Sequence, residues 1–403
     1  MKTNKSQINK KWVEKELNEV ATFFNGKAHE NDISDNGKYI VINSKFVSTN
    51  GAIAKYSDTC LSPLKKGDVV MVMSDVPNGK AIAKCFLVDQ DNKYTLNQRI
   101  GGFRSHEINS SFLYYLLNRN KYFLSFDDGV NQTNLRRDDI LDCPLYYPLL
   151  PEQNRIVSVL ATWDKAIEKL SKKIEVKKQI KKGLMQDLLT GRKRLEGFSD
   201  KWETVELDDV SDFINGYTFK SSSYCDNGKY KIITIANVQD GFMLIDGSKT
   251  IKELPINITE DQKLSKGDIL VSMTGNVGRV CLVDNDNCLL NQRVGKIKPR
   301  NINKDLLYLL LLDRRFLNKM IDSAQGGAQA NLSTGDIKEY IVDIPKSKEE
   351  QSAIAQILTT ADKEINKLEN KLKILKEQKR YLLNNLITGT IRTPETLSAK
   401  LTK

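Results

Sequence analysis

The sequence predicts an α+β protein: two similar α/β domains separated by two long antiparallel coiled-coil helices, with a pseudo-twofold internal repeat. Three observations predict this fold. One long block of sequence occurs twice, and each copy has the apolar periodicity of a long helix. The segments that precede the two blocks share a looser series of short sequence words.

The repeated block begins near Pro151 and recurs 198 positions later without a gap. Its copies open on Glu-Gln and close on Thr-Gly, and they match at Glu152/Glu350, Gln153/Gln351, Leu160/Leu358, Asp164/Asp362, Ile167/Ile365, Leu170/Leu368, Thr190/Thr388 and Gly191/Gly389. A repeat of this length predicts a duplicated architecture.

Both blocks are predicted to be helices, because apolar residues alternate three and four apart over about four heptads, as in a coiled-coil seam. Pro151 suits a first helical turn, Ser347 and Glu350 form a capping-box pattern, and Gly191 and Gly389 suit the ends. The alternative is that each helix packs only on its own domain. The charged faces beside the seam favour pairing.

Lys181 and Lys379 recur at the same seam position, where a cation in a tight dimeric coiled coil is costly. We therefore expect the seam to loosen there or to face a partner. Residues 164–194 hold 11 Lys and Arg against 4 Asp and Glu. This basic stretch fits either a phosphate-contacting rod or an ordinary solvated face.

The segments before the helices repeat more loosely, with short loop insertions. Each has an Asn-Gly turn, a Lys-Gly-Asp word before an apolar strand, an Asn-Gln-Arg word, and a short amphipathic helix. The predicted boundaries are a first domain at 1–148, a helical region at 149–195, a second domain at 196–346, a second helical region at 347–392 and a tail at 393–403.

The composition favours a polyanionic partner such as nucleic acid, because Lys and Arg number 62 against 51 Asp and Glu, a net charge of +11. The six cysteines form no C-x-x-C pair and indicate buried or incidental thiols in a reducing compartment. The start of the chain has no apolar signal region, and the apolar run 306–312 is too short to span a bilayer. We expect a cytoplasmic protein without a membrane partner.

The sequence offers little for catalysis, and we predict no catalytic or metal site. It has no phosphate-binding loop of the G-x-x-x-x-G-K-[ST] type, and its two histidines, His29 and His106, fit structural roles. The acidic pairs Asp138-Asp139 and Asp208-Asp209 could form a metal-dependent nuclease site. Capping is the favoured interpretation, because the Asp139 position recurs as Asp336 beside Ile in both copies.

The order of domain, helix, domain, helix, with both Glu-Gln…Thr-Gly…Arg blocks, resembles the specificity subunits of type I restriction-modification systems over essentially the whole chain. The resemblance implies a non-catalytic subunit whose two target-recognition domains each read half of a split DNA target. It also implies helices that set the gap between the half-sites.

The resemblance further implies that the helices dock two adenine-N6 methyltransferase subunits and that restriction subunits join the full complex. S-adenosylmethionine, ATP and Mg²⁺ would be bound by these partners and not by this chain. In agreement, the sequence has no [DN]-P-P-[YF] word, because no two of its prolines are adjacent.

Candidate DNA contacts are polar or basic residues in predicted loops, since Lys and Arg contact phosphates while Arg, Asn and Gln read base edges. They are Lys27, Lys45, Arg99, Lys220, Ser221, Ser222, Thr274, Asn276, Arg293 and Gln329. The Asn-Gln-Arg words are identical in both domains, which favours a scaffold or phosphate role for them. Residues 272–278 differ from the matching 73–79, which predicts an asymmetric target.

Three alternatives stay open at this point. The chain could serve a related system whose partner fuses methylation and cleavage, it could be a coiled-coil scaffold that binds protein and no DNA, or it could be an enzyme with an unrecognised site.

Overall fold

The computed structural model describes residues 12–76, 79–324 and 330–397, and its contacts divide the chain into two compact units. One unit comprises Met1–Ser171 with Lys371–Lys403, and the other comprises Lys172–Asn370. Each therefore contains one globular domain, part of the first long helix and part of the second. The boundaries predicted from the sequence place each long helix in a region of its own, whereas the contacts divide each helix between the two units.

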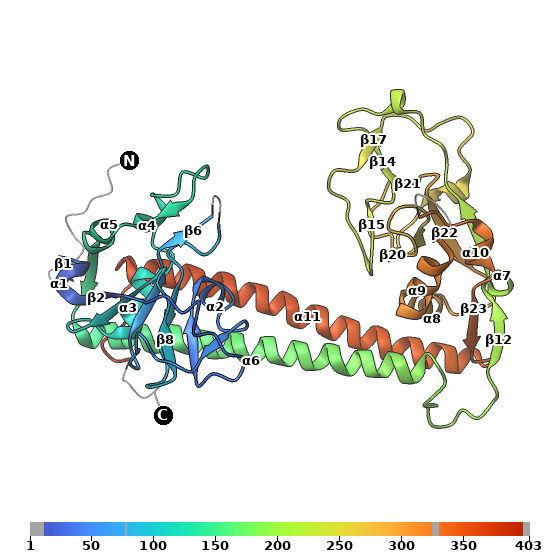
Figure 1. Ribbon diagram of the computed structural model, residues 1–403. Helices are drawn as coiled ribbons and strands as arrows, with labels where there is room; N and C mark the ends of the chain where they lie inside the picture. The colour runs from blue at the N-terminus through green and yellow to red at the C-terminus, as the bar shows by residue number, and fades with distance from the viewer. Residues whose placement is uncertain (1–11, 77–78, 325–329, 398–403) are drawn as a thin grey trace. The chain divides into compact units, whose positions relative to one another are not determined.

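The domain of the first unit is built from short, mostly antiparallel strands (Figure 1). Its main sheet has the order β2-β9-β5-β7, formed by Ala21–Asn25, Ile100–Ser105, Val69–Val72 and Cys85–Leu87. A second sheet, β4-β3-β8, contains Lys55–Ser57, Tyr39–Ile42 and Tyr94–Leu96, and β3 and β8 run parallel. Two strand pairs complete it, β1 (Trp12–Glu16) with β11 (Pro144–Pro148) and β6 (Ser74–Asp75) with β10 (Thr133–Asn134).

Short helices cover these sheets. They are α1 (Leu17–Val20), α2 (Ser44–Ser48), α3 (Ser110–Leu117), α4 (Lys121–Leu124) and α5 (Arg137–Leu141). The predicted amphipathic helix is α3, whose Phe112, Leu113 and Leu117 are fully buried. Asn109 starts it by accepting hydrogen bonds from the first-turn N–H groups of Ser111 and Phe112.

The domain of the second unit repeats the main sheet and the parallel strand pair of the first. Its main sheet, β13-β22-β19-β20, is formed by Ser211–Asn215, Val294–Pro299, Ile269–Ser272 and Val280–Leu282. A second sheet, β17-β14-β21-β18, contains Lys249–Ile251, Tyr230–Ile233, Cys288–Leu290 and Lys263–Leu264, with β14 parallel to β21. β12 (Glu203–Glu206) pairs with β23 (Ile341–Ile344), and β15 (Val238–Gln239) pairs with β16 (Phe242–Met243).

The helices of this domain are α7 (Leu207–Val210), α8 (Lys304–Leu312), α9 (Arg314–Ser323) and α10 (Thr334–Lys338), with 3₁₀ turns η1 (Ser221–Ser223) and η2 (Glu260–Gln262). The α+β class and the internal repeat are therefore confirmed. In both domains a four-stranded antiparallel sheet lies beside a sheet that contains one parallel pair. Among the described residues, no helix combines the length and the hydropathy needed to cross a membrane.

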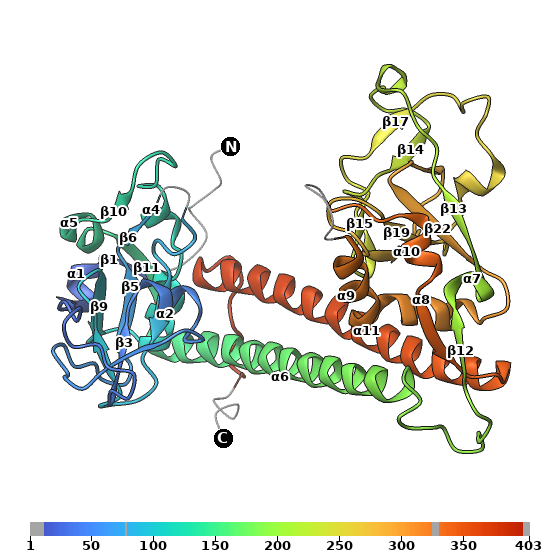
Figure 2. The same ribbon diagram turned by 45° about the vertical axis from the view of Figure 1, so that its right-hand side comes forward.

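The two repeated blocks form the long helices α6 (Leu150–Leu188) and α11 (Lys348–Ile387), which lie side by side in both views (Figures 1 and 2). In the first unit Asp164 of α6 pairs with Lys379 of α11. In the second, Lys181 of α6 pairs with Asp362 of α11 at 2.5 Å. In each unit the helix segments run antiparallel, because higher numbers on α6 face lower numbers on α11.

These ion pairs give the physical reason why lysines are tolerated at 181 and 379. Each ammonium group meets a carboxylate of the facing helix, which offsets the cost of a cation at the seam. The internal repeat relates the two ion pairs to each other. Asp164 of α6 corresponds to Asp362 of α11, and Lys181 of α6 corresponds to Lys379 of α11. The repeat therefore encodes its own complementary charges.

Helix pairing and packing on the domains occur together. Ile156 and Leu160 at the start of α6 join the core of the first domain, and Leu188 at its end joins the core of the second. The caps also depart from the prediction in one respect. Ser347 accepts a hydrogen bond from the Glu350 N–H, but the Glu350 carboxylate binds Arg194 and leaves the capping box half formed. Gly191 and Gly389 have the expected left-handed conformation, with φ of 65° and 71°.

Gly183 lies inside α6, and a Cβ built there would meet nothing within 4 Å. Since glycine weakens a helix interior, Gly183→Ala is expected to raise the free energy of unfolding by about 0.5–1 kcal/mol. Urea unfolding of the two proteins, compared at equal slope, checks this. An alanine variant of lower stability would show that the backbone at 183 needs glycine.

Candidate nucleic-acid interface

In the first domain, segments that the sequence singled out meet at the Asn-Gln-Arg turn. Lys27 forms a parallel bridge with Asn97, and its N–H donates to the Leu96 carbonyl at 3.0 Å. The Asn97 N–H donates to the Ile42 carbonyl, three residues before Lys45. The Arg99 carbonyl accepts from the Met73 N–H, just before β6. Backbone hydrogen bonds thus place Lys27, Lys45 and Arg99 around one turn.

The Asn-Gly words before these positions have a steric cause. A Cβ on Gly26 would lie 2.1 Å from the Asn97 carbonyl oxygen, and one on Gly216 would lie 2.0 Å from that of Asn291. Only glycine permits such a close approach of two backbones. The identical Asn-Gln-Arg words therefore form a turn framework in both domains, as the scaffold interpretation predicts.

The side chains of Lys27, Lys45 and Arg99 are exposed, so they are free to meet a polyanion. Gln98 is held in place by donating from Nε2 to Glu30 Oε1 at 2.9 Å. The arrangement provides two lysines for phosphate oxygens and one forked guanidinium for phosphate or a base edge.

The second domain has the same frame around Asn291. Tyr217 forms the parallel bridge with Asn291, Thr218 Oγ1 donates to Gln292 Oε1 at 2.6 Å, and the Arg293 carbonyl accepts from the Met273 N–H. Lys220, Ser221 and Ser222 follow in an exposed 3₁₀ turn, and Asn276 and Arg293 are also exposed.

Two predicted contacts stand differently. The Thr274 side chain is 8% exposed and its backbone bridges Asn331, so Thr274 contributes to the framework of the second domain. Gln329 lies outside the described residues.

The two frames carry unlike side chains at matching places. Lys27 bridges the turn in the first domain, and the aromatic Tyr217 does so in the second. Three residues further on, Glu30 stands where the second domain has Lys220. At equivalent positions of the two frames, the first domain therefore has an acid where the second has a base, and a cation where the second has an aromatic ring.

The loops after β5 and β19 differ as well. In the first domain the Asp75 carboxylate accepts from the N–H groups of Ala81 and Ile82. In the second, Ser272 Oγ donates to the Asn276 carbonyl and accepts from the Arg279 N–H. A carboxylate therefore accepts backbone N–H groups in the first domain, and a hydroxyl accepts one in the second.

A further acid lies near the first of these loops. The strand pair β6–β10 adjoins residues 127–131, where N–H groups donated by Asn131 and Val130 hold the pKa of Asp128 at about 2. This loop therefore stays negative at neutral pH.

Two further residues lie on this surface, and the sequence pattern pointed to only one of them, Gln132. Arg279, whose Nη1 donates to Gln239 Oε1 at 2.6 Å, belongs to no repeated word. Gln132 donates to Ser74 Oγ at 2.8 Å, and Ser74 Oγ donates to Asn134 Oδ1 at 2.6 Å. The Gln-x-Asn word that recurs at 132 and 329 was the available signal for Gln132.

Residues considered for catalysis have structural partners. His29 is buried between the Lys27 carbonyl and Thr95 Oγ1, and Asp139 and Asp209 accept from N–H groups at helix starts. Burial raises the pKa of the Cys143 and Cys281 thiols to about 12, so both stay protonated at neutral pH. Within the described residues, no three His, Cys, Asp or Glu side chains group as metal ligands.

The family model described as "Type I restriction modification DNA specificity domain" matches residues 9–178 and 199–377, once for each half of the repeat. The chain belongs to the type I restriction-modification specificity subunits. The predicted family is thereby confirmed.

Several relatives cover most of this specificity subunit. The type I restriction enzyme MjaVIII specificity subunit of Methanocaldococcus jannaschii is 28% identical over 301 residues, 70% of each chain. The MjaIX specificity subunit of the same organism is 23% identical over 350 residues, 81% of this chain and 78% of that one.

Solved structures share the fold of the specificity subunit. The S subunit of a type I restriction-modification system from M. genitalium superposes with a TM-score of 0.62 at 17% identity, over 96% of this chain and 98% of that one. A chain from a study of complex assembly in the type I system gives a TM-score of 0.54 at 15% identity, over 94% and 98%.

Proposed function

We propose that this specificity subunit recognises double-stranded DNA in a type I restriction-modification complex and reads a bipartite, asymmetric target. The observation that carries the proposal is the pair of like turn frames with unlike exposed side chains. A common framework gives each domain the same way of approaching a duplex, while the side chains mounted on it can differ in the bases they prefer.

The individual residues have separate roles in this proposal. Lys27, Lys45 and Lys220 bind phosphates, with Ser221 and Ser222 as hydroxyl donors beside Lys220. Arg99 and Arg293, which occupy equivalent places, make the same backbone contact in both half-sites. Asn276 and the residues that differ between the frames supply base preference.

The partners are proposed on the same basis. The paired helices α6 and α11 dock two adenine-N6 methyltransferase subunits, and restriction subunits join them in the full complex. The chain itself supplies no catalytic group. S-adenosylmethionine, ATP and Mg²⁺ act in the partner subunits, and the complex works in the cytoplasm.

Mapping N6-methyladenine in DNA from cells that express this chain with its methyltransferase tests the proposal. The expected result is one motif with two different half-sites separated by a fixed gap. A palindromic motif would contradict the asymmetry, and the absence of any chain-dependent motif would contradict DNA recognition. Binding of the purified complex to DNA should weaken with salt, with a linear log–log slope, whereas a pure protein scaffold should show none.

A further inference from the structure

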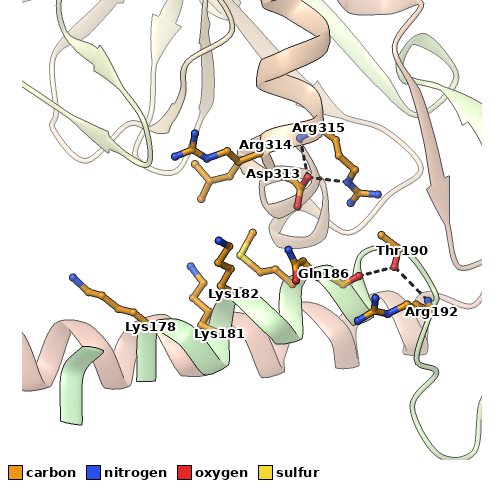
Figure 3. Close-up of a pocket in the computed structure, with 11 residues that line it drawn as sticks. Lys178, Lys181, Lys182, Gln186, Thr190, Arg192, Asp313, Arg314 and Arg315 are labelled. Carbon is orange, nitrogen blue, oxygen red and sulfur yellow. Dashed lines mark hydrogen bonds and ion pairs between the residues drawn. The ribbon is translucent and has the colours of Figure 1, made fainter. Parts of the chain in front are cut away.

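A cavity of 760 Å³ lies within the second unit, between the end of α6 and the start of α9. Its walls carry six basic side chains and one acidic one, Asp313. In Figure 3 Lys181 and Lys182 rise from α6 on the side where Arg314 projects from α9, and Arg315 points the other way, toward Arg192. The basic residues are Lys178, Lys181, Lys182, Arg192, Arg314 and Arg315.

Four of these cations are held by carboxylates. Lys178 pairs with Glu369 at 2.6 Å, Lys181 with Asp362 at 2.5 Å, Arg315 with Asp313 at 2.8 Å, and Arg192 with Asp187. Each lysine ammonium still has further N–H donors, since one carboxylate oxygen takes only one of three.

Two cations lack such a partner. Among the residues the structure describes, no carboxylate lies within ion-pair distance of Lys182 or Arg314, and both side chains are exposed. Asp313 is already occupied, because its Oδ1 accepts from the backbone N–H and the Nε of Arg315. The cavity therefore has an uncompensated positive charge from opposite walls.

The first unit has a cavity at the equivalent place, with fewer basic residues in its walls. The matching cavity of the first unit, 470 Å³, is lined mainly by amides, aromatic rings and apolar groups, with Arg119 and Lys121 as its cations. Arg119 Nη1 donates to the Ile82 carbonyl at 2.9 Å. The walls of the first unit's cavity thus carry two cations, where those of the second unit's cavity carry six.

We propose that the cavity of the second unit binds phosphate groups. Lys178 and Lys182 are one helical turn apart on α6, about 6 Å along the axis. Arg314 faces them with a planar fork that fits two oxygens of one phosphate. The ligand is either the sugar-phosphate backbone of a nucleic acid or a free polyphosphate, because the side chains recognise the chemistry that these two share. Phosphate binding in this cavity is distinct from recognition of the DNA sequence, because it involves no contact with a base.

Isothermal titration of the full-length chain with inorganic tripolyphosphate tests the site. The variant K182Q/R314Q removes the two unpaired cations and leaves the four ion pairs in place, so it is expected to lower the affinity about tenfold or more. The matched control is K121Q/R380Q in the first unit, where Arg380 corresponds to Lys182 and Lys121 follows the helix cap as Arg314 does. This control removes the same charge and should change the affinity less than about twofold.

Salt titration of the same proteins with a DNA duplex that lacks the methylated motif separates the two sources. If backbone phosphates occupy the cavity, K182Q/R314Q should reduce the log–log salt slope by about one to two, and the control should not. If free polyphosphate is the ligand, K182Q/R314Q should keep the log–log salt slope of the wild type for DNA binding and lose only its affinity for tripolyphosphate. The proposal is overturned if wild-type and K182Q/R314Q proteins bind tripolyphosphate and DNA alike. The methylation motif is read out separately, so its loss or retention reports on target recognition alone.

Discussion

Replacement of Arg194 by methionine is expected to lower the free energy of unfolding by about 3–5 kcal/mol, because it leaves a buried carboxylate without its cation. Glu350 is 1% exposed, and Arg194 binds both of its oxygens, at 2.7 and 2.8 Å. The remaining donor, Trp202 Nε1, is 3.4 Å away and carries no charge. Chemical denaturation of the variant and the wild type measures the effect.

Two further variants make this prediction specific. Lys193→Met removes an adjacent, largely exposed cation that lies 3.4 Å from Asp187, and it should cost less than about 0.5 kcal/mol. The double variant R194M/E350M should recover most of the loss, since no charge is then left buried. Equal stability of R194M and K193M would contradict a structural role for the Arg194–Glu350 pair.

Gly216→Ala is expected to destabilise the protein by about 3 kcal/mol and to abolish recognition of one half-site. The new Cβ would lie 2.0 Å from the Asn291 carbonyl oxygen and 2.2 Å from its carbon, which are backbone atoms that cannot rotate away. The Asn-Gln-Arg turn must then move, and Arg293 moves with it. Thermal unfolding and methylation mapping measure the two consequences.

The matched variants are Gly26→Ala, whose Cβ would meet the Asn97 carbonyl oxygen at 2.1 Å, and Gly183→Ala, whose Cβ meets nothing within 4 Å. Gly26→Ala should disturb the half-site read by the first domain, and Gly183→Ala should leave both intact. If Gly216→Ala kept its full two-part motif at normal stability, the turn framework would have no part in recognition.

The two parts of the candidate interface differed in how well the sequence predicted them. The turn framework was visible as Asn-Gly and Asn-Gln-Arg words repeated in both domains, because a turn that brings backbones close restricts the residue types within a few positions. The exposure of individual side chains was not visible. Thr274 looked like a loop residue, and its burial follows from a bridge to Asn331, distant in the sequence.

The sequence by itself determined the duplicated order of domains and helices, the two helix lengths and the glycine ends at 191 and 389. These properties depend on apolar periodicity and local backbone conformation, which neighbouring residues encode. Only the tertiary structure decided which charges meet: Lys181 with Asp362, Arg194 with Glu350, and the basic walls of the cavity beside α9. Those contacts join residues more than a hundred positions apart, so they depend on how the chain packs and not on its local pattern.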